Sequence, residues 1–515
     1  MKYKMSKFKN FITNHFNITA FLIFAVVVFS LYGKTLFFDW TYYDDDVLIL
    51  DKQEYLSFSN IKNILFTTVF GQDGDKFCRP VLNLTFLFEK YFYGIKPLGY
   101  HFTNILIHLF AVFSIFLFLT LRYDKKKTLI LCLFFLCHPA LTQAVAWVPG
   151  RNDSLLTIFL VLSCYFFVKY VDKNKKTSLI LYCVFFILAL FTKETAIVVP
   201  VFYFMILICN KKGIKQYLLH FVIITLIILI YLLYRNIVLN YQTYSLTFKI
   251  LIINFYSSFP TITKYIANIF FPVKLSIFPT MLEVNYLLCI TSVLVFVLLF
   301  IKSRSYNLKI ISFGFIWFFL FLFPTFLMPN NQSFDHRLYL PLVGIMIVVL
   351  EFINKNDKLF KIKNIIICSI IFLLFFTITF LYEQNFKNKE IFWVKAYTIS
   401  PNSDIANAMV GGLLLERGLY NESEEKYKKA IELRESSKHY NNLAALYYRT
   451  KRIDDAEQCL LKSLSLNNKN PNVYYNLSLI YKLKGENEKA QEMKDWYIKV
   501  FNDTNKVSKI EDIDL

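Results

Sequence analysis

Acidic and basic side chains that could catalyse a group transfer lie in the connections between long apolar segments of the sequence. Three consecutive aspartates, Asp44, Asp45 and Asp46, follow the first of these segments. Cationic candidates stand in later connections, and they are Arg79, Arg151, Lys193, Arg235 and Arg337. A carboxylate can accept the proton of an attacking hydroxyl, and Arg or Lys can bind a departing phosphate. Together these groups would suit the transfer of a sugar from a lipid phosphate to a hydroxyl.

Other polar residues adjoin these candidates and could orient them. Glu194 directly follows Lys193, so we expect the carboxylate to orient the amine. Asp335 directly precedes His336 and Arg337, and we expect it to orient one of the two. The full set of supporting residues is Asp46, His138, Asp153, Glu194, Arg235, Asp335 and His336.

Each of these residue types also has a purely structural explanation. Aspartate favours helix N-caps, long basic side chains extend to the membrane interface, and histidine can satisfy backbone groups. The functional interpretation therefore depends on their joint placement on one side of a membrane. No His-x-x-x-His pair or paired cysteine spacing indicates a metal site. No cofactor is indicated either, although the aspartate cluster leaves a bound divalent cation open.

Membrane-spanning helices are the elements that must position these residues. Hydrophobic residues make up 56% of the 515 residues and charged residues 18%, whereas about a quarter of a soluble protein is charged. Apolar stretches of about 20 residues, the length that crosses a bilayer core, recur along the chain. We expect eleven spans, near Ile18–Phe37, Tyr100–Leu121, Thr128–Val148, Ser154–Val171, Ser178–Phe191, Ala196–Cys209, Tyr217–Tyr234, Tyr286–Ile301, Leu308–Leu327, Leu338–Phe352 and Ile365–Leu381.

The placement of Lys and Arg predicts the orientation of these spans. Basic connections fall alternately between them, at Arg122–Lys127, Lys169–Lys176, Lys211–Lys215, Lys302–Lys309 and Lys355–Lys363. By the positive-inside rule this side, which includes the N-terminus, is cytoplasmic. The first loop, residues 38–99, and the C-terminus are then exoplasmic. The stretch Ser245–Pro279 is interrupted by prolines and is expected to be re-entrant or interfacial.

The net charge of +20 is a consequence of this topology signal. The basic residues lie mainly beside apolar segments, and no basic stretch is long enough to form a nucleic-acid-binding arm. We therefore expect no nucleic-acid partner.

A soluble helical repeat begins near Gln384, where charged residues and helix formers become frequent. Small residues recur there every 33–34 positions, as Gly411, Ala444 and Ser478 do. Small residues at fixed positions let paired helices approach closely, which is typical of tetratricopeptide (TPR) repeats stacked into a short solenoid. The predicted fold class is therefore all-α. A polytopic membrane domain, a TPR-like domain and a tail follow one another as residues 1–383, 384–505 and 506–515.

Several motifs at the exoplasmic ends of the spans support a family resemblance. They are Tyr43-Asp44-Asp45, Arg79-Pro80 with Asn83, Gly99–Asn104 with Leu106 and His108, His138-Pro139, Gly150–Asp153, Lys193–Thr195 and Asp335–Pro341. In order and spacing they resemble those of the transmembrane-and-TPR O-mannosyltransferase family and its bacterial relatives, within the glycosyltransferase C superfold. With the repeats, the resemblance covers nearly the whole chain.

This resemblance implies a sugar donor linked to polyprenyl or dolichyl phosphate, with mannose as one candidate sugar, and an inverting transfer at the exoplasmic face. An acidic residue of the first loop would be the base, which by position is Asp44 or Asp45, with Asp46 ranked lower. The donor phosphate would contact Arg79, Arg151, Lys193 and Arg337, with Arg235 a weaker candidate. The TPR domain would recruit an acceptor protein or glycan.

Two other hypotheses stay open at this point. The chain could be a non-catalytic membrane scaffold whose TPR domain gathers partners for envelope or glycan assembly. It could also be a transporter of lipid-linked sugars, although such a protein would need more charged residues within its spans. The frequent Lys, Asn, Ile and Phe residues suggest an AT-rich bacterial genome. We therefore expect an inner-membrane protein with a periplasmic site, or a lumenal site in the endoplasmic reticulum if the source is eukaryotic.

Overall fold

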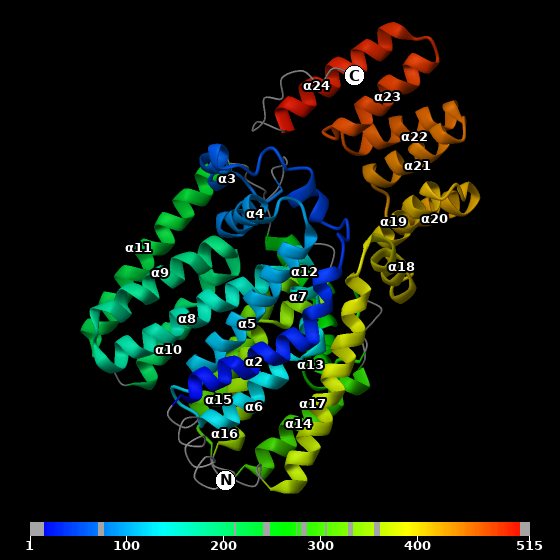
Figure 1. The fold of residues 1–515 in the computed structure, drawn as a ribbon. Coiled ribbons are helices and arrows are strands. Elements are labelled where there is room, and N and C mark those ends of the chain that lie inside the picture. The colour runs from blue at the N-terminus through cyan, green and yellow to red at the C-terminus, as the bar shows by residue number, and fades with distance from the viewer. Residues whose placement is uncertain are drawn as a thin grey trace. The chain divides into compact units, whose positions relative to one another are not determined.

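The chain is helical throughout the part that the structure describes (Figure 1). The structure is a computed structural model, and it describes residues 15–70, 77–210, 213–239, 248–273, 275–279, 286–303, 306–327, 333–354 and 361–504. The predicted tail, residues 506–515, lies outside these ranges. Within them no strand occurs, which confirms the predicted all-α class.

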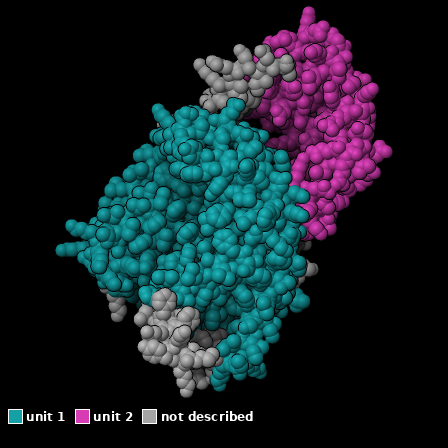
Figure 2. All heavy atoms as spheres, in the orientation of Figure 1, with its two compact units in different colours: residues 1–67, 77–275, 281–388 teal, residues 68–76, 276–280, 389–515 magenta. Residues whose placement is uncertain are grey.

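The residues form two compact units, which Figure 2 shows in different colours. The membrane unit comprises residues 1–67, 77–275 and 281–388, and the repeat unit comprises residues 68–76, 276–280 and 389–515. The last membrane helix continues as a 3-10 turn as far as Phe386, just before residue 389, where the C-terminal part of the repeat unit begins.

Six helical segments among the described residues are long and apolar enough to cross a membrane. They are α2 with η1 (Phe16–Phe37), α5 (Pro97–Leu119), η5 with α8 (Val148–Lys173), α11 (Ile214–Val238), α15 (Leu308–Leu327) and α17 with η10 (Ile362–Phe386). A seventh segment joins α6 (Lys125–Leu136) to Pro139–Ala146, the latter ending in α7 (Gln143–Ala146), with a bend of 56°. The bend falls where Pro139 cannot continue the helix.

Four further apolar helical segments are shorter, with at most 17 residues each. They are α9 (Lys176–Thr192), η6 with α10 (Glu194–Cys209), α14 (Tyr286–Lys302) and α16 (Pro341–Ile353). Every predicted span coincides with one of these eleven segments. Because a bilayer core needs about 20 residues of helix, only six or seven of them qualify by length, so the number of eleven is not confirmed. The multi-pass character is confirmed.

In the described part of the first loop, residues 38–99, there are two α-helices and two shorter helical turns. The elements are η2 (Asp46–Leu50), η3 (Phe58–Asn60), α3 (Ile61–Leu65) and α4 (Pro80–Tyr93). Helix α4 begins with proline, whose missing N–H costs nothing at that position, and it ends at Gly94 with a φ of 63°. It buries Phe86 and Glu89 and exposes Phe92. This geometry brings the start of α4, with Arg79 just before it, into the membrane unit.

The stretch Ser245–Pro279 contains two short helices, α12 (Phe248–Ser258) and α13 (Thr261–Phe270). They are separated at Pro260, which cannot donate a helical hydrogen bond. Neither helix has the length of a span. Helix α13 buries Lys264 and Asn268 on one face, four residues apart, so this apolar-looking stretch carries a polar stripe.

Two helices that flank the later candidate residues pack without a gap. Gly314 of α15 lies against Gly344 of α16, and a Cβ added at Gly314 would lie 2.6 Å from the Gly344 carbonyl oxygen. Such small-residue contacts let membrane helices approach closely. The turn η8 (Asp335–Leu338) lies in the connection between the two helices, so their contact supports the turn.

Replacing Gly314 with Ala is expected to destabilise the protein by about 1–3 kcal/mol, because the added methyl overpacks the contact. Gly33→Ala is the matched control, since a Cβ there meets no atom within 4 Å. Thermal unfolding of the detergent-solubilised variants measures the difference. Equal unfolding temperatures for the two variants would contradict the close contact.

Seven helices follow one another in the part of the repeat unit that the structure describes. They are α18 (Lys389–Ile399), α19 (Asp404–Glu416), α20 (Tyr420–Leu433), α21 (Ser437–Arg449), α22 (Ile453–Leu466), α23 (Pro471–Leu483) and α24 (Asn487–Thr504). Helices α19–α20, α21–α22 and α23–α24 pack as hairpins. The turns within these pairs repeat one conformation, with Gly418, Lys451 and Gly485 at φ values of 77°, 61° and 76°. The predicted TPR repeats are confirmed.

Candidate active site

The loop that carries the three aspartates has an unusual backbone. Tyr42 and Asp44 have φ values of 54° and 62°, in the left-handed region that few non-glycine residues adopt. The Thr41 N–H donates to the Asp45 carboxylate at 2.7 Å, and the Thr41 hydroxyl donates to the same oxygen. Strained residues of this kind persist where the surroundings hold them and are frequent at functional sites. Asp44 itself is half-buried.

Asp45 is buried, with 1% of its surface exposed. One carboxylate oxygen accepts both hydrogen bonds from Thr41, and the other has no hydrogen-bond partner among the described residues. Burial raises the pKa of Asp45 to about 7, while the bonds from Thr41 act in the opposite direction. Asp45 therefore fixes the conformation of the loop through Thr41. Asp46 accepts a hydrogen bond from the N–H of Val47.

An aromatic stack connects this loop to the later part of the chain. The rings of Tyr43 and Trp147 are stacked with centroids 5.2 Å apart, and the Trp147 Nε1–H donates to the Tyr43 carbonyl at 2.9 Å. The Trp147 ring also lies near the His336 ring, with centroids 6.1 Å apart. The Tyr43 hydroxyl interacts electrostatically with both Asp44 and Arg337. The first loop and the turn η8 therefore meet.

Lys193 pairs with Asp153 and not with its neighbour in sequence. The Nζ of Lys193 lies 2.7 Å from Asp153 Oδ1, and His336 Nε2 lies 3.9 Å from the other carboxylate oxygen. Gln143 contacts the second ring nitrogen of His336 at 2.9 Å. Burial lowers the pKa of His336 to about 3, so its ring is neutral. Burial also lowers the pKa of Lys193.

Glu194 pairs with Arg79, which corrects the expectation that it orients Lys193. Arg79 Nη2 lies 3.1 Å from Glu194 Oε2, and the N–H of Cys78 donates to the other oxygen at 3.1 Å. Arg79 acts electrostatically on Lys193, so the two cations lie near one another. Glu194 therefore links the start of α4 to the beginning of η6.

Arg337 is a half-buried cation whose guanidinium has no carboxylate within ion-pair distance among the described residues. The guanidinium carbon lies 5.5 Å from the centroid of the Phe334 ring. It acts electrostatically on Asp153, Lys193 and His336. Arg79, Lys193 and Arg337 thus supply three positive charges against the two negative charges of Asp153 and Glu194. Among these five side chains the cations outnumber the carboxylates by one, and Asp44 adds a third carboxylate near Arg337.

Helix α13 holds the turn that carries Arg337. Tyr265 donates to the Phe334 carbonyl at 3.2 Å. Asn268 donates to the Asp335 carboxylate at 2.8 Å, and Lys264 lies 3.3 Å from the same oxygen. Asp335 therefore anchors the turn to α13. The expected role of Asp335 was to orient His336 or Arg337. The His336 ring contacts Gln143.

Arg151, predicted to contact the donor phosphate, pairs with other protein groups in the structure. Its side chain is fully buried, with Nη1 2.6 Å from Glu89 Oε2 and Nη2 donating to the Tyr100 carbonyl at 3.2 Å. The guanidinium also lies over the ring of Phe86. These contacts engage both terminal nitrogens of the guanidinium.

His138 lies apart from the cluster, and Arg235 lies at its edge. His138 Nε2 contacts the Ile269 carbonyl at 3.2 Å, and its Nδ1 accepts from the N–H of Ala140 at 3.3 Å. Arg235 is half-buried on α11 and acts electrostatically on Tyr231, as Arg79 and Glu194 do. It therefore lies at the edge of the cation cluster, beside the Arg79–Glu194 pair.

The aspartate cluster does not gather into a metal site. Within the described part of the chain, no three His, Cys, Asp or Glu side chains could hold a metal ion together. Asp45 and Asp46 are directed to Thr41 and Val47, respectively.

Sequence reasoning missed several residues that position the cluster. Gln143 contacts the His336 ring and orients it, and the Glu89 carboxylate balances the positive charge of Arg151. Lys264 and Asn268 hold Asp335. The spacing of Lys264 and Asn268 on one helical face was a usable signal, because a polar stripe in an apolar helix faces other protein groups. The sequence around Glu89 and around Gln143 shows no comparable spacing of polar residues.

Comparisons with known proteins identify relatives of part of this chain. Residues 88–234 match the family described as dolichyl-phosphate-mannose-protein mannosyltransferase. The protein O-mannosyl-transferase Tmtc1 of Drosophila melanogaster is 30% identical over 179 residues, which cover 34% of this chain and 21% of the relative. Part of this chain is homologous to protein O-mannosyl-transferases. TMTC3 of Homo sapiens is 31% identical over 153 residues, covering 28% of this chain and 16% of the relative.

The matched region includes Asp153, Lys193 and Glu194, and it ends before Arg337. Asp44 and Arg79 precede it. The chain spans about a fifth of the length of the curated relatives it matches. The repeat unit is matched separately, as tetratricopeptide repeats at residues 438–470 and 459–492.

Proposed function

We propose that this protein is an integral-membrane glycosyltransferase that moves a sugar from a polyprenyl or dolichyl phosphate to a hydroxyl of an acceptor protein. Mannose is the sugar that the names of the protein O-mannosyl-transferase relatives suggest. The observation that carries the proposal is Arg337, a cation without a carboxylate partner among the described residues, beside Lys193 and the Tyr43–Asp44 loop. A buried charge is costly unless it is paired, and the donor phosphate would supply the pair.

In this proposal the acceptor oxygen attacks the anomeric carbon as the bond from that carbon to the phosphate oxygen breaks. The hydroxyl proton passes to the carboxylate of Asp44, and the departing lipid phosphate takes the electron pair of the broken bond. Arg337 and Lys193 stabilise the charge on that phosphate, with Arg79 nearby. Attack from the side opposite the phosphate inverts the anomeric configuration.

We further propose that all eleven apolar segments cross the membrane. The six long segments, the bent pair and the four shorter helices account for the eleven spans expected from the sequence. Short helices can span where the bilayer thins or where flanking polar residues reach the interface. Eleven crossings from a cytoplasmic N-terminus would put Asp44, Arg337 and the repeat unit on the exoplasmic side, the periplasm if the protein is bacterial.

Replacing Arg337 with Ala is expected to lower kcat/KM for the lipid-linked donor about 10- to 100-fold, since hydrogen bonds to charged groups contribute about 1.5–3 kcal/mol. The loss should appear mainly as a higher KM for dolichyl phosphate mannose, with a Ser/Thr-containing peptide as acceptor. Arg122→Ala is the control, because Arg122 is half exposed near Glu351, away from the cluster. Equal donor KM values for the two variants would overturn the assignment, and absence of transfer by the unmodified protein would overturn the proposed function.

A further inference from the structure

His336 and Asp153 face one another across a gap that is too long for a hydrogen bond. His336 Nε2 lies 3.9 Å from Asp153 Oδ2, whereas an N–H···O bond is about 2.7–3.2 Å long. The other oxygen of Asp153 accepts a hydrogen bond from Lys193 at 2.7 Å. Within the described part of the chain, Nε2 and Oδ2 take part in no hydrogen bond, and the two side chains keep 11% and 8% of their surfaces exposed. A small polar group can therefore reach both atoms.

Gln143 determines what His336 presents to this gap. Gln143 Oε1 lies 2.9 Å from His336 Nδ1, and because a carbonyl oxygen can only accept, the proton of the neutral ring is on Nδ1. His336 Nε2 then carries a lone pair, and the Asp153 carboxylate is likewise an acceptor. Gln143 is buried, so its contact holds the ring in one orientation. The gap thus offers two hydrogen-bond acceptors side by side.

Two neighbouring acceptors select the chemistry of the group that binds between them. A hydroxyl donates one hydrogen bond, so two neighbouring hydroxyls of a hexose would satisfy Nε2 and Oδ2 together. An ionised phosphate would not fit there, because its oxygens only accept and the Asp153 carboxylate repels its charge. The ring centroids of Trp147 and Phe334 lie 6.1 and 5.3 Å from that of His336, so apolar surface adjoins the polar pair.

The gap also adjoins the cations to which the donor phosphate is assigned. Lys193 bonds Asp153, and Arg337 follows His336 in the turn η8 and acts electrostatically on Asp153. A sugar whose phosphate is bound by Lys193 and Arg337 would therefore have hydroxyls within reach of the acceptor pair.

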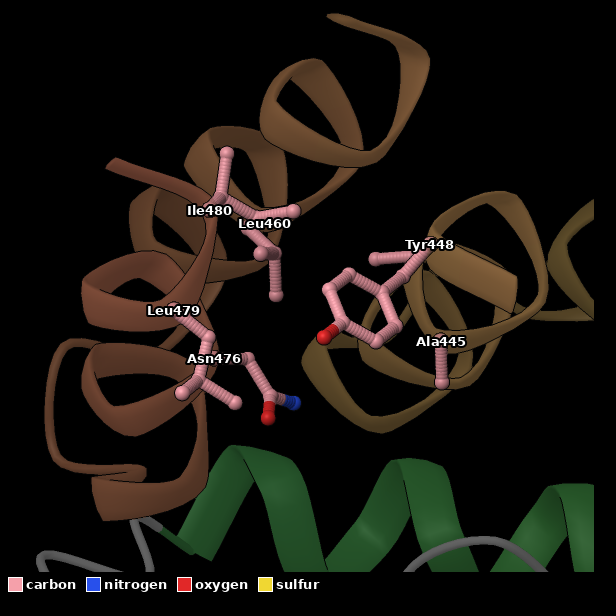
Figure 3. Close-up of a pocket in the computed structure, with 7 residues that line it drawn as sticks. Ala445, Tyr448, Leu460, Asn476, Leu479 and Ile480 are labelled. Atoms are coloured by element: carbon pink, nitrogen blue, oxygen red, sulfur yellow. The ribbon is translucent and has the colours of Figure 1, made fainter. Parts of the chain in front are cut away.

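An apolar pocket of the repeat unit differs from this gap in its chemistry. Ala445, Leu460 and Leu479 line it, with the Tyr448 hydroxyl and the Asn476 amide as polar groups (Figure 3). No carboxylate or imidazole is among the residues that line this pocket. Of the two places, the gap between His336 and Asp153 is the one that matches a sugar attached to a phosphate.

We propose that His336 Nε2 and Asp153 Oδ2 accept hydrogen bonds from two neighbouring hydroxyls of the sugar that the lipid phosphate carries. This inference rests on the proposed function, and it adds residues that recognise the sugar to those that bind the phosphate. Gln143 is a positioning residue, which acts on the sugar through the His336 ring. A site that bonds a hydroxyl disfavours a ligand without it, because the polar groups of the site are then left unpaired. The pair should therefore distinguish a sugar-bearing lipid from the bare lipid phosphate.

The test compares the affinities of the detergent-solubilised full-length protein for dolichyl phosphate mannose, dolichyl phosphate glucose and dolichyl phosphate, measured by microscale thermophoresis. Binding needs neither an acceptor nor turnover. His336→Phe keeps a planar ring but lacks the acceptor. It is expected to lower the affinity for at least one sugar-bearing lipid, relative to that for dolichyl phosphate, about three- to tenfold. Gln143→Leu leaves His336 in place but frees its ring, and is expected to lower the same ratio about two- to threefold.

His138→Phe is the matched control, since it makes the same exchange at a buried histidine apart from the cluster and should leave both ratios unchanged. Arg337→Ala should weaken binding of all three lipids alike, because they share the phosphate. A ratio compares only protein that binds, so a loss of stability does not imitate the expected result.

Unchanged ratios for both sugars in His336→Phe and Gln143→Leu would overturn this inference and leave the proposed function intact. Equal changes in His336→Phe and His138→Phe would do the same. If the unmodified protein binds none of the three lipids, the proposed function itself is overturned, and the sugar contact with it.

Discussion

Replacing Asp44 with Asn is expected to lower the rate of sugar transfer about 100- to 10 000-fold, the usual contribution of a general base. Asn has the size of Asp and tolerates the left-handed backbone that Asp44 adopts at a φ of 62°. The loop should therefore keep its conformation while losing the group that takes the proton. The loss should appear in kcat, with the KM for dolichyl phosphate mannose almost unchanged, in steady-state transfer to a peptide acceptor.

Asp45→Asn is the informative companion to this variant. Its carboxylate fixes the loop by accepting two hydrogen bonds from Thr41, and an amide placed there leaves buried N–H donors without partners. We expect a smaller loss of activity together with a lower unfolding temperature. A large loss in Asp45→Asn with none in Asp44→Asn would exchange the two roles. Full activity in both variants and in the double variant would exclude both residues as the base.

Replacing Arg151 with Ala is expected to destabilise the protein by about 3–5 kcal/mol, because it leaves a buried charge without its partner. Arg151 is fully buried and Glu89 nearly so, with their atoms 2.6 Å apart. The truncation also removes the donor to the Tyr100 carbonyl and the contact with the Phe86 ring. Unfolding of the detergent-solubilised protein by SDS or heat measures the effect.

The double variant Glu89→Gln/Arg151→Met is the control for this interpretation. It removes both charges and keeps most of the volume, and such replacements of buried pairs are often close to neutral. We expect it to be markedly more stable than Arg151→Ala. If Arg151→Ala instead leaves stability unchanged and raises the donor KM, Arg151 contacts the phosphate as the sequence suggested.

The membrane helices and the repeats were predictable because their signals are local. An apolar stretch of sufficient length reports a helix without reference to the rest of the chain, and all eleven predicted segments are helical. The recurrence of Gly411, Ala444 and Ser478 likewise follows from contacts within adjacent helix pairs. The number of crossings was less predictable, since helices of 17 residues or fewer fall below the length that a bilayer requires.

The partners within the site were not predictable, because ion pairing depends on three-dimensional proximity. Lys193 and Glu194 are neighbours in sequence, yet they pair with Asp153 and Arg79, respectively. Successive residues around a turn point in different directions, so adjacency favours no contact between their side chains. In the sequence, Arg151 could not be distinguished from the other candidate cations. The ion pair with Glu89, which only the three-dimensional structure reveals, indicates a structural role for Arg151.

The hydrogen bonds by which α13 holds the turn η8 also affect how the protein matures. Tyr265 and Asn268 hold a turn that is synthesised about 70 residues later, and at about 5–20 residues per second that interval lasts several seconds. The Asp44 loop is made far earlier still. Until η8 has been synthesised, Tyr265 and Asn268 of α13 lack the groups that they bind in the folded protein. The first loop likewise lacks Arg337. In the proposed function, the protein therefore becomes competent for transfer only late in synthesis, after η8 has been made.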